Sequence, residues 1–536
     1  MNQNALGWKF FLPFLFLFFL VSSYLSLSGY ISNFDEGIST YGAVRVSQGD
    51  IPYRDFWTGY GPAQFYILAS LFKIFGPSLF VERMWSQFVF ILLLIVSYLI
   101  LNKSCSRRAA LVGVFTMALL LINFSHKAVA TTNPMFPGIL FCLTSCYFFL
   151  NFLSEGVKRD AVFSGLCVAA TALFRPELAL AVFFLQTTIA IIFFNLNLSK
   201  NVRAWFWYPS SVFVALIPIL IFFFFHCNPK DLFSDFIAYP LDIYPKFRSI
   251  PFFLYLSMSG HVRPDRLFWG LPRVIICVFS IVVLITGMVS LTIQVVRLRI
   301  KNEIPVIWYG CILFIALELI CLKYSTTRTD SFHLFPLLGT STILLFLLFS
   351  AFPKMKYLRL WLASLVFLFC FSLSLNLNEE FKQIFSFKPN VFDIKLARGI
   401  PVNRGDYALQ EAVKFIQQNV PRKEKIFVGS ISHDRVVIND VLFYFLSERG
   451  SATKYYEFEP GITTTKEIQQ KIIEDIKTAK VRYIVLRTND WWSEPNGSRM
   501  SSGVYLLDQF IQSNFRVIKK MGTYIILCRI DFKSIV

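Results

Sequence analysis

Charged residues are scarce in this chain of 536 residues: lysine, arginine, aspartate and glutamate together make up 16% of it. Ordinary globular domains carry about 25% charged residues. A conventional water-soluble enzyme is therefore excluded as a description of the whole chain. Hydrophobic residues make up 55% and aromatic residues 17%, so we expect much of the chain to face lipid.

Acidic residues are the scarcer charge type, with 33 Asp and Glu against 52 Lys and Arg and a formal net charge of +19. Such an excess can indicate nucleic-acid binding. Here, however, the basic residues collect in short connections between apolar runs, where the positive-inside rule expects them. We attribute most of the charge to membrane topology and expect no nucleic-acid partner.

Paired cysteine motifs are also missing. The ten cysteines lie mostly within apolar runs, as Cys142, Cys146, Cys277 and Cys321 do, and their spacing is not typical of a metal or redox site. We interpret them as packing residues. The first apolar run, 10–30, has no convincing small-residue cleavage site, so we expect it to remain as a transmembrane helix.

A helix needs about 20 apolar residues to cross a bilayer, and about eleven such runs precede residue 380. They lie at 9–30, 85–101, 109–125, 134–153, 160–174, 178–195, 205–226, 272–296, 304–322, 332–351 and 358–378.

The connections between these runs alternate in charge. Every second connection is short and basic, as in Lys103 with Arg107 and Arg108, which predicts that this set is cytoplasmic. The longer loops 31–84 and 227–271 are then extracytoplasmic. The N-terminus is expected to be cytoplasmic, and the odd number of runs places the C-terminus outside.

The pattern changes near residue 390 to a mixture of amphipathic helices and short apolar strands. Strands are predicted at 426–428, 481–486 and 524–528. We therefore predict a polytopic α-helical membrane module over 1–380, whose first outer loop is catalytic, and a soluble extracytoplasmic α/β domain over 390–536.

Two adjacent carboxylates follow the first run, in Asn33-Phe34-Asp35-Glu36-Gly37. A carboxylate at the membrane surface can accept a proton from an attacking hydroxyl or amine, and it can help to hold a divalent cation. Alternatively, the pair caps the next helix, predicted over 38–48, because acidic residues are favoured at helix starts.

Further motifs follow in order along the chain. They are Gly49-Asp50-Ile51-Pro52-Tyr53-Arg54-Asp55-Phe56, Gly59-Tyr60-Gly61-Pro62, Arg83, Phe174-Arg175-Pro176-Glu177, Phe247-Arg248-Ser249-Ile250-Pro251, Arg328-Thr329-Asp330-Ser331-Phe332-His333, 444–449 and 459–465. The ordered set resembles GT-C fold glycosyltransferases, in the group of protein mannosyltransferases and aminoarabinose transferases of lipid A. The last two motifs are similar to bacterial members.

The resemblance implies a polyprenyl-phosphate-linked sugar as donor, transfer on the outer face of the membrane and inversion at the anomeric carbon. It implies a glycan, glycolipid or protein as acceptor. It also makes Asp35 the general base or a metal-associated carboxylate. Glu36 either assists Asp35 or caps the helix, and we favour the cap. No cofactor is assigned, and a divalent metal stays an open alternative.

A lipid phosphate needs cationic partners, and the planar fork of arginine matches phosphate oxygens. The candidates are Arg83, Arg175, Arg248 and Arg328, with Asp330 and His333 joining Arg328 in the preferred phosphate site. Each arginine has an alternative role, which is snorkelling to headgroups or local pairing, as Arg175 could pair with Glu177 and Arg328 with Asp330.

Two other functions stay open, namely a transporter or flippase for lipid-linked saccharides and a non-catalytic assembly factor. Transporters usually place ionisable groups near mid-membrane, whereas Glu318 is nearly alone within the predicted spans. Asp35 and the Arg328 cluster argue against an inactive scaffold. We therefore predict an inverting glycosyltransferase in a bacterial inner membrane.

Overall fold

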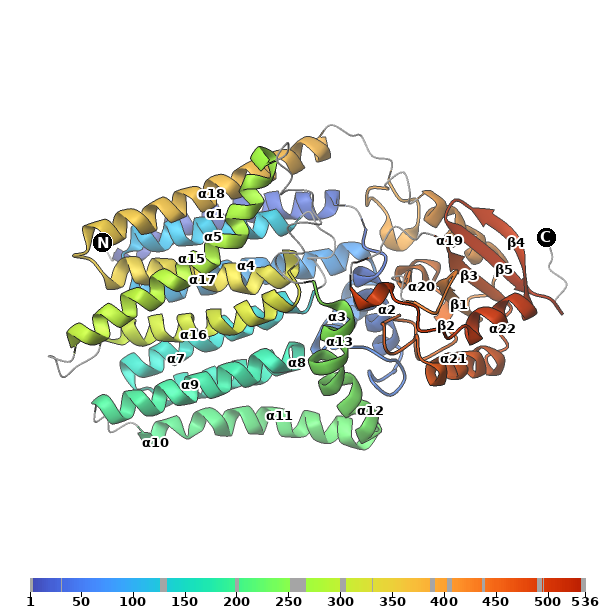
Figure 1. The fold of residues 1–536 in the computed structure, drawn as a ribbon, viewed down its shortest axis with the longest axis horizontal. Coiled ribbons are helices and arrows are strands. Elements are labelled where there is room, and N and C mark those ends of the chain that lie inside the picture. Colours follow the sequence, from blue (N-terminus) through green and yellow to red (C-terminus); the bar gives the residue numbers. More distant parts are fainter. Residues whose placement is uncertain are drawn as a thin grey trace.

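The computed structural model describes residues 3–29, 31–125, 133–197, 202–250, 267–298, 305–329, 331–385, 391–402, 407–435, 439–488, 494 and 496–531 (Figure 1). Its long helices form one bundle. They are α1 (Gln3–Ser28), α4 (Leu79–Ser104), α5 (Arg107–Ser125), α7 (Met135–Glu155), α8 (Lys158–Phe174), α9 (Pro176–Asn197), α11 (Trp207–His226), α15 (Leu267–Leu298), α16 (Val306–Thr327), α17 (Ser331–Ala351) and α18 (Lys356–Phe385).

Each predicted apolar run lies on one of these helices. Within the described residues, ten helices are long and apolar enough to cross a membrane by length and composition. The remaining run forms α8, which has 17 residues and packs against α7 and α11. The predicted multi-pass helical membrane fold is thus confirmed.

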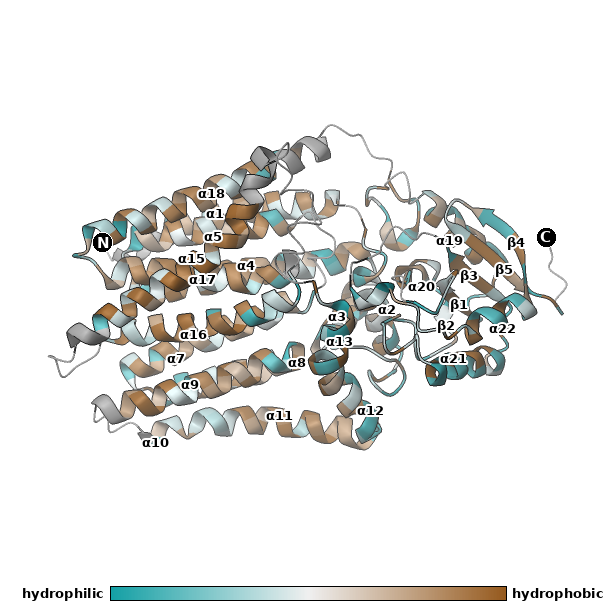
Figure 2. Ribbon diagram, in the orientation of Figure 1, coloured by the Kyte–Doolittle hydropathy of each residue, from teal (hydrophilic) through white to brown (hydrophobic). Residues whose placement is uncertain are grey.

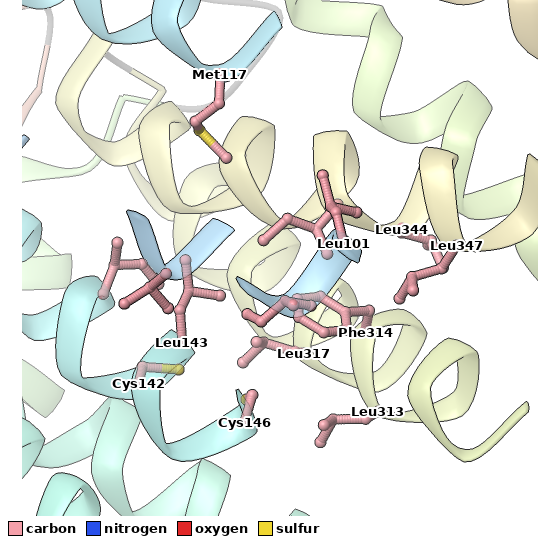
Figure 3. Close-up of a cluster of buried hydrophobic side chains, with 14 of the residues drawn as sticks. Leu101, Met117, Cys142, Leu143, Cys146, Leu313, Phe314, Leu317, Leu344 and Leu347 are labelled. Atoms are coloured by element: carbon pink, nitrogen blue, oxygen red, sulfur yellow. The ribbon is translucent and has the colours of Figure 1, made fainter. Parts of the chain in front are cut away.

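The bundle helices are predominantly brown, and so hydrophobic, in Figure 2. Apolar side chains are both buried within the bundle and exposed on its surface. A continuous helix satisfies its own backbone hydrogen bonds, which is what a lipid environment demands. Cys142, Cys146 and Leu317 are fully buried in the interior, and Figure 3 shows them among other apolar side chains. The cysteines are free, in agreement with their interpretation as packing residues.

Shorter helices connect the bundle to the C-terminal part (Figure 1). They are α2 (Asp35–Ser47), α3 (Ala63–Phe75), α12 (Pro229–Phe233), the π-helix η1 (Ser234–Ile243) and α13 (Tyr244–Arg248). The four-residue helix α10 (Val202–Trp205) lies at the opposite end of the bundle, next to α11. The predicted helix over 38–48 is α2, and it begins three residues earlier, at Asp35. Buried residues of α2 and α3 share one hydrophobic core with the C-terminal sheet.

The C-terminal part is a five-stranded sheet in the order β2-β1-β3-β5-β4, in which β2, β1 and β3 are parallel and β5 and β4 antiparallel. Its strands are β1 (Lys425–Ser430), β2 (Gly450–Ser451), β3 (Tyr483–Arg487), β4 (Phe515–Met521) and β5 (Tyr524–Arg529). One face packs against α19 (Tyr407–Asn419) and α20 (Leu442–Ser447), and the other against α21 (Lys466–Thr478) and α22 (Leu506–Asn514). Two short 3-10 helices, η3 (Lys395–Ala397) and η5 (Gly497–Arg499), complete the fold.

The carboxyl ends of the three parallel strands share one edge of the sheet, the place where open α/β sheets usually bind ligands. The segments that follow these strands reach the membrane side of the molecule. The backbone N of Leu442 donates to the carbonyl of Asn33, and that of Trp57 donates to the carbonyl of Lys454. We call this contact zone between the bundle, α2 and the sheet the junction.

Candidate functional site

The C-terminal part fixes the segment 33–37 from one side. The Asn33 amide donates hydrogen bonds to Asp440 Oδ2 at 2.7 Å and to Tyr524 Oη at 3.2 Å. Burial raises the pKa of Asp440 above its ordinary value. Gly37 approaches the start of α20 so closely that a Cβ atom would overlap the backbone N of Leu442. Glycine is therefore required at this position if the two helices are to pack.

The bundle fixes the same segment from the other side. Arg83 Nε lies 2.8 Å from Glu36 Oε1, and both side chains are completely buried. Arg83 also donates to the carbonyls of Ser26 and Gly29 at the end of α1, where a cation interacts favourably with the helix dipole. Glu36 accepts a further hydrogen bond from the backbone N of Ser32. The structure therefore commits Glu36 and Arg83 to each other, and the roles predicted for them in catalysis and phosphate binding remain predictions.

Asp35 begins α2 and is half-buried. Its carboxylate accepts hydrogen bonds from Ser32 Oγ at 3.3 Å and from Tyr60 Oη at 3.2 Å. Tyr53 Oη in turn donates to the Tyr60 carbonyl at 2.8 Å. Burial, aided by the charge of Asp35, raises the pKa of Tyr60 well above its ordinary value. Tyr60 therefore remains a neutral hydrogen-bond donor to Asp35.

The loop that carries Tyr60 packs directly against the end of α8. A Cβ atom at Gly61 would overlap the carbonyl of Leu173. Just beyond lies Arg175, whose Nε donates to Glu177 Oε1 at 2.5 Å. Its guanidinium carbon lies 4.9 Å from the centre of the Tyr324 ring. The structure thus contains the local pairing considered for Arg175.

Two arginines share one carboxylate on the other side of the junction. Arg328 binds Glu494 through both terminal nitrogens, at 2.8 Å and 2.5 Å, and also donates to the carbonyl of Arg248 at 2.7 Å. Arg248 Nη1 lies 3.4 Å from Glu494 Oε2, and Arg248 Nε lies 3.8 Å from Glu459 Oε2. The amide of Asn496 donates to Glu494 Oε2 at 2.8 Å. We call Arg248 and Arg328 the arginine pair.

The two carboxylates beside the arginine pair, Glu459 and Glu494, differ in the direction of their pKa shifts. Burial tends to raise the pKa of Glu494, but the hydrogen bonds from Arg328 and the charges of both arginines outweigh it and lower the pKa to about 2. Burial raises the pKa of Glu459, with Arg248 opposing it. Glu494 therefore stays ionised to a lower pH than Glu459 does.

The third member of the predicted phosphate site, His333, lies at the start of α17. Its ring stacks on Tyr324 at 4.9 Å and lies 6.4 Å from the ring of Tyr244, which belongs to α13. His333 therefore adjoins Arg175 through Tyr324. Asp330 lies outside the described residues.

Several junction residues are not assigned roles by the sequence. Glu457, Glu459 and Glu494 follow parallel strands of the sheet, and burial raises the pKa of Glu457 well above its ordinary value. Glu459 and Tyr60 belong to recognised motifs. Glu494 carries no motif, and only its position after the strand β3 could have indicated it.

In the described part of the chain, no group of three or more His, Cys, Asp or Glu side chains is arranged to hold a metal ion. The adjacent acids Asp35 and Glu36 diverge, because Glu36 turns to Arg83 while Asp35 faces Tyr60.

Residues 60–223 match the family model described as dolichyl-phosphate-mannose-protein mannosyltransferase. This segment includes Arg83 and Arg175 but begins after Asp35. No curated protein matches the chain.

Solved structures are similar over nearly the whole chain. ArnT from Cupriavidus metallidurans bound to undecaprenyl phosphate covers 98% of both chains at 11% identity, with a TM-score of 0.57. The same protein in the apo state gives a TM-score of 0.56 at 14% identity, again over 98% of both chains. The oligosaccharyltransferase of Archaeoglobus fulgidus in complex with zinc and sulfate covers 95% of this chain and 72% of its own, at 12% identity and a TM-score of 0.52. The resemblance predicted from the motifs is therefore confirmed at the level of the fold, and the chain has the GT-C fold of membrane glycosyltransferases.

Proposed function

We propose that the protein is an inverting glycosyltransferase that moves a sugar from a polyprenyl-phosphate donor to an acceptor on the outer face of a bacterial inner membrane. In this orientation the N-terminus is cytoplasmic and the junction is extracytoplasmic. The observation that carries the proposal is the placement of Asp35, which its neighbours anchor from two sides while its carboxylate faces Tyr60.

Tyr60 and Glu459 connect this carboxylate to the arginine pair. The charges of Asp35 and Glu459 both act on Tyr60, and Glu459 also faces Arg248. The junction therefore offers a base for the acceptor and cations for a phosphate. The lipid-phosphate ligand named for ArnT supports the same class of donor.

Asp35 would take the proton of an acceptor hydroxyl or amine as that group attacks the anomeric carbon from the face opposite the phosphate. The bond between the anomeric carbon and the phosphate oxygen breaks, and its electron pair leaves with the lipid phosphate. Arg248 and Arg328 would stabilise the charge that develops on the leaving group. Tyr60, as a neutral donor, would keep Asp35 oriented.

The experiment is mass spectrometry of total glycolipids and surface glycans from cells that carry the wild-type protein, Asp35→Asn, Asp242→Asn or no protein. Asp242 is a matched control, because it is an exposed carboxylate of η1 paired with Lys246. We expect one glycan to lack a single sugar in the null and Asp35→Asn cells, with a prenyl-phosphate sugar accumulating. Asp242→Asn should behave as wild type.

Membrane levels of all variants are compared in the same cells. If Asp35→Asn restores the glycan fully while the null lacks it, Asp35 is not the base. The transporter and assembly-factor functions would then account for the null phenotype better.

A further inference from the structure

Glu494 makes with Arg328 the contact that a phosphate would make. Its two oxygens accept from the two terminal nitrogens of Arg328 at 2.8 Å and 2.5 Å, and Arg248 approaches one of them at 3.4 Å. Arginine forks bind carboxylates and phosphates in the same bidentate manner. A phosphate and the Glu494 carboxylate therefore cannot occupy the Arg328 fork together.

We propose that Glu494 is an internal counter-anion of the arginine pair, which a lipid phosphate must displace from Arg328 in order to bind. This inference rests on the proposed function, because it takes the arginine pair as the site of the donor phosphate. It adds a residue of the C-terminal part that sets the affinity for the lipid phosphate.

Burial explains why a counter-anion is needed. Arg248 and Arg328 are each 7% exposed, and a buried charge without a partner is strongly destabilising. Glu459 is a weaker substitute, since it lies 3.8 Å from Arg248 and burial raises its pKa. Glu494 stabilises the pair whenever no phosphate is present.

The contact between Glu494 and Arg328 also contributes to turnover. After transfer, the arginine pair holds the released lipid phosphate, and a pair without a competitor would retain this product. Competition by an internal group lowers the apparent affinity in proportion to its occupancy of the site. The return of Glu494 to Arg328 therefore assists product release.

The test is binding of a polyprenyl phosphate to the purified full chain in lipid nanodiscs, with polyprenol and inorganic phosphate as separate arms. Glu494→Gln keeps the shape of the side chain and removes its charge. We expect polyprenyl phosphate to bind roughly 10- to 100-fold more tightly to this variant, the range expected from losing charge-assisted hydrogen bonds. Polyprenol binding should be unchanged. Tightening for inorganic phosphate alone would overturn the assignment to a lipid ligand.

Two control variants separate competition from a general change of charge. Glu424→Gln removes a similar fork, since Glu424 binds Arg482 through two nitrogens elsewhere on the sheet, and should leave lipid binding unchanged. Glu459→Gln removes a carboxylate beside the arginine pair without freeing the Arg328 fork. Equal tightening in Glu459→Gln and Glu494→Gln would overturn the proposal, as would unchanged or weaker binding in a folded Glu494→Gln protein.

A second variant covers the case in which Glu494→Gln does not fold. Asn496→Ala retains every charge but removes the amide that holds Glu494 Oε2 at 2.8 Å. It should tighten polyprenyl phosphate binding several-fold, and unchanged binding would contradict the proposal. Arg328→Gln tests the proposed function separately. If wild-type affinity survives that change, the phosphate site itself is misassigned.

Discussion

The interior of the helical bundle and the junction are built in opposite ways. Within the bundle, neutral groups meet one another, as Ser145, Ser164 and Gln186 do across α7, α8 and α9. The junction instead buries full charges. Arg83 with Glu36 is completely buried, and the arginine pair with Glu494 is nearly so.

This difference distinguishes the interactions that hold a membrane fold together from the buried charges that a reaction would require. Neutral hydrogen bonds and close packing are sufficient to associate helices in lipid. Buried ion pairs often contribute no more stability than apolar side chains of similar size. The proposed reaction would account for their concentration at the junction, with the bundle serving mainly to hold the junction in place.

Breaking the most buried ion pair should have the largest effect on stability. Arg83→Met leaves Glu36 buried without its cation, which is expected to lower the free energy of unfolding by about 3–5 kcal/mol. Thermal and denaturant unfolding in detergent measure the loss. Adding Glu36→Leu to Arg83→Met should restore much of it, because the charge is then removed altogether. As a control, Arg482→Met breaks the partly exposed pair with Glu424 and should cost less than about 1 kcal/mol. An unchanged stability in Arg83→Met would refute a structural role for the pair.

The bundle was predictable from the sequence because the bilayer imposes a simple rule of length and hydropathy. The predicted strands 426–428, 481–486 and 524–528 likewise overlap β1, β3 and β5, the strands with the most buried side chains, although β3 begins two residues later than predicted. β4 was missed because its middle carries Arg516, Lys519 and Lys520, whose side chains are exposed at the sheet edge.

The candidate site was predictable only in part. Asp35 stands out because it directly follows an apolar run. Its partner Tyr60 lies 25 residues away, and sequence spacing across a loop does not fix such a contact. For Arg328 the local partner considered from the sequence, Asp330, lies outside the described residues, and the structure also pairs Arg328 with Glu494, 166 residues away. Contacts made by the packing of the sheet onto the bundle leave no periodic signal in the sequence.

The buried carboxyl group of Asp235, on η1, tests whether burying another charge at the junction also lowers the free energy of unfolding. Burial raises its pKa to about 7 from the ordinary 3.8, with Lys454 opposing the shift and Asp231 adding to it. The folded state therefore binds the proton more tightly than the unfolded state. The stability that protonation confers is fully present below pH 3.8 and is lost as the pH rises through about 7.

Asp235→Asn cannot titrate, so its free energy of unfolding should fall less than that of the wild type between about pH 5 and about pH 8, by roughly 2–3 kcal/mol. Unfolding curves at both pH values measure this difference. Asp231→Asn is the control, because Asp231 is a half-exposed carboxylate that pairs with the same Lys454. Parallel pH dependence in wild type and Asp235→Asn would show that Asp235 is not protonated in the folded state.

Tyr60→Phe separates the effect of a hydrogen bond at the junction from the effect of a charge, because it removes one hydrogen bond and no charge. Asp35 would lose the donor that lies 3.2 Å from its Oδ1. We expect kcat to fall roughly tenfold, the loss expected for one hydrogen bond to a charged group, and the acid limb of the pH–rate profile to move to higher pH. Tyr53→Phe is the control, since the Tyr53 hydroxyl donates to the backbone carbonyl of Tyr60 and its removal also deletes one hydrogen bond without removing a charge. An unchanged pH profile in Tyr60→Phe would place Tyr60 outside the proton transfer.

Replacing Glu318 should have the smallest effect on stability and activity. It also tests the contrast between a neutral bundle and a charged junction most directly, because Glu318 is an acid in the middle of the bundle. It is completely buried on α16 and accepts a hydrogen bond from Ser341 Oγ on α17. Glu318→Gln keeps an acceptor for Ser341, so we expect unfolding to change by less than about 1 kcal/mol and sugar transfer to continue at the wild-type rate. The converse change, Gln186→Glu, places a carboxyl group among the neutral partners Ser145 and Ser164 and should cost more. If Glu318→Gln instead abolished transfer in a folded protein, an ionisable group in mid-membrane would be essential, as in transporters. The bundle could then no longer be regarded as a neutral support for the junction.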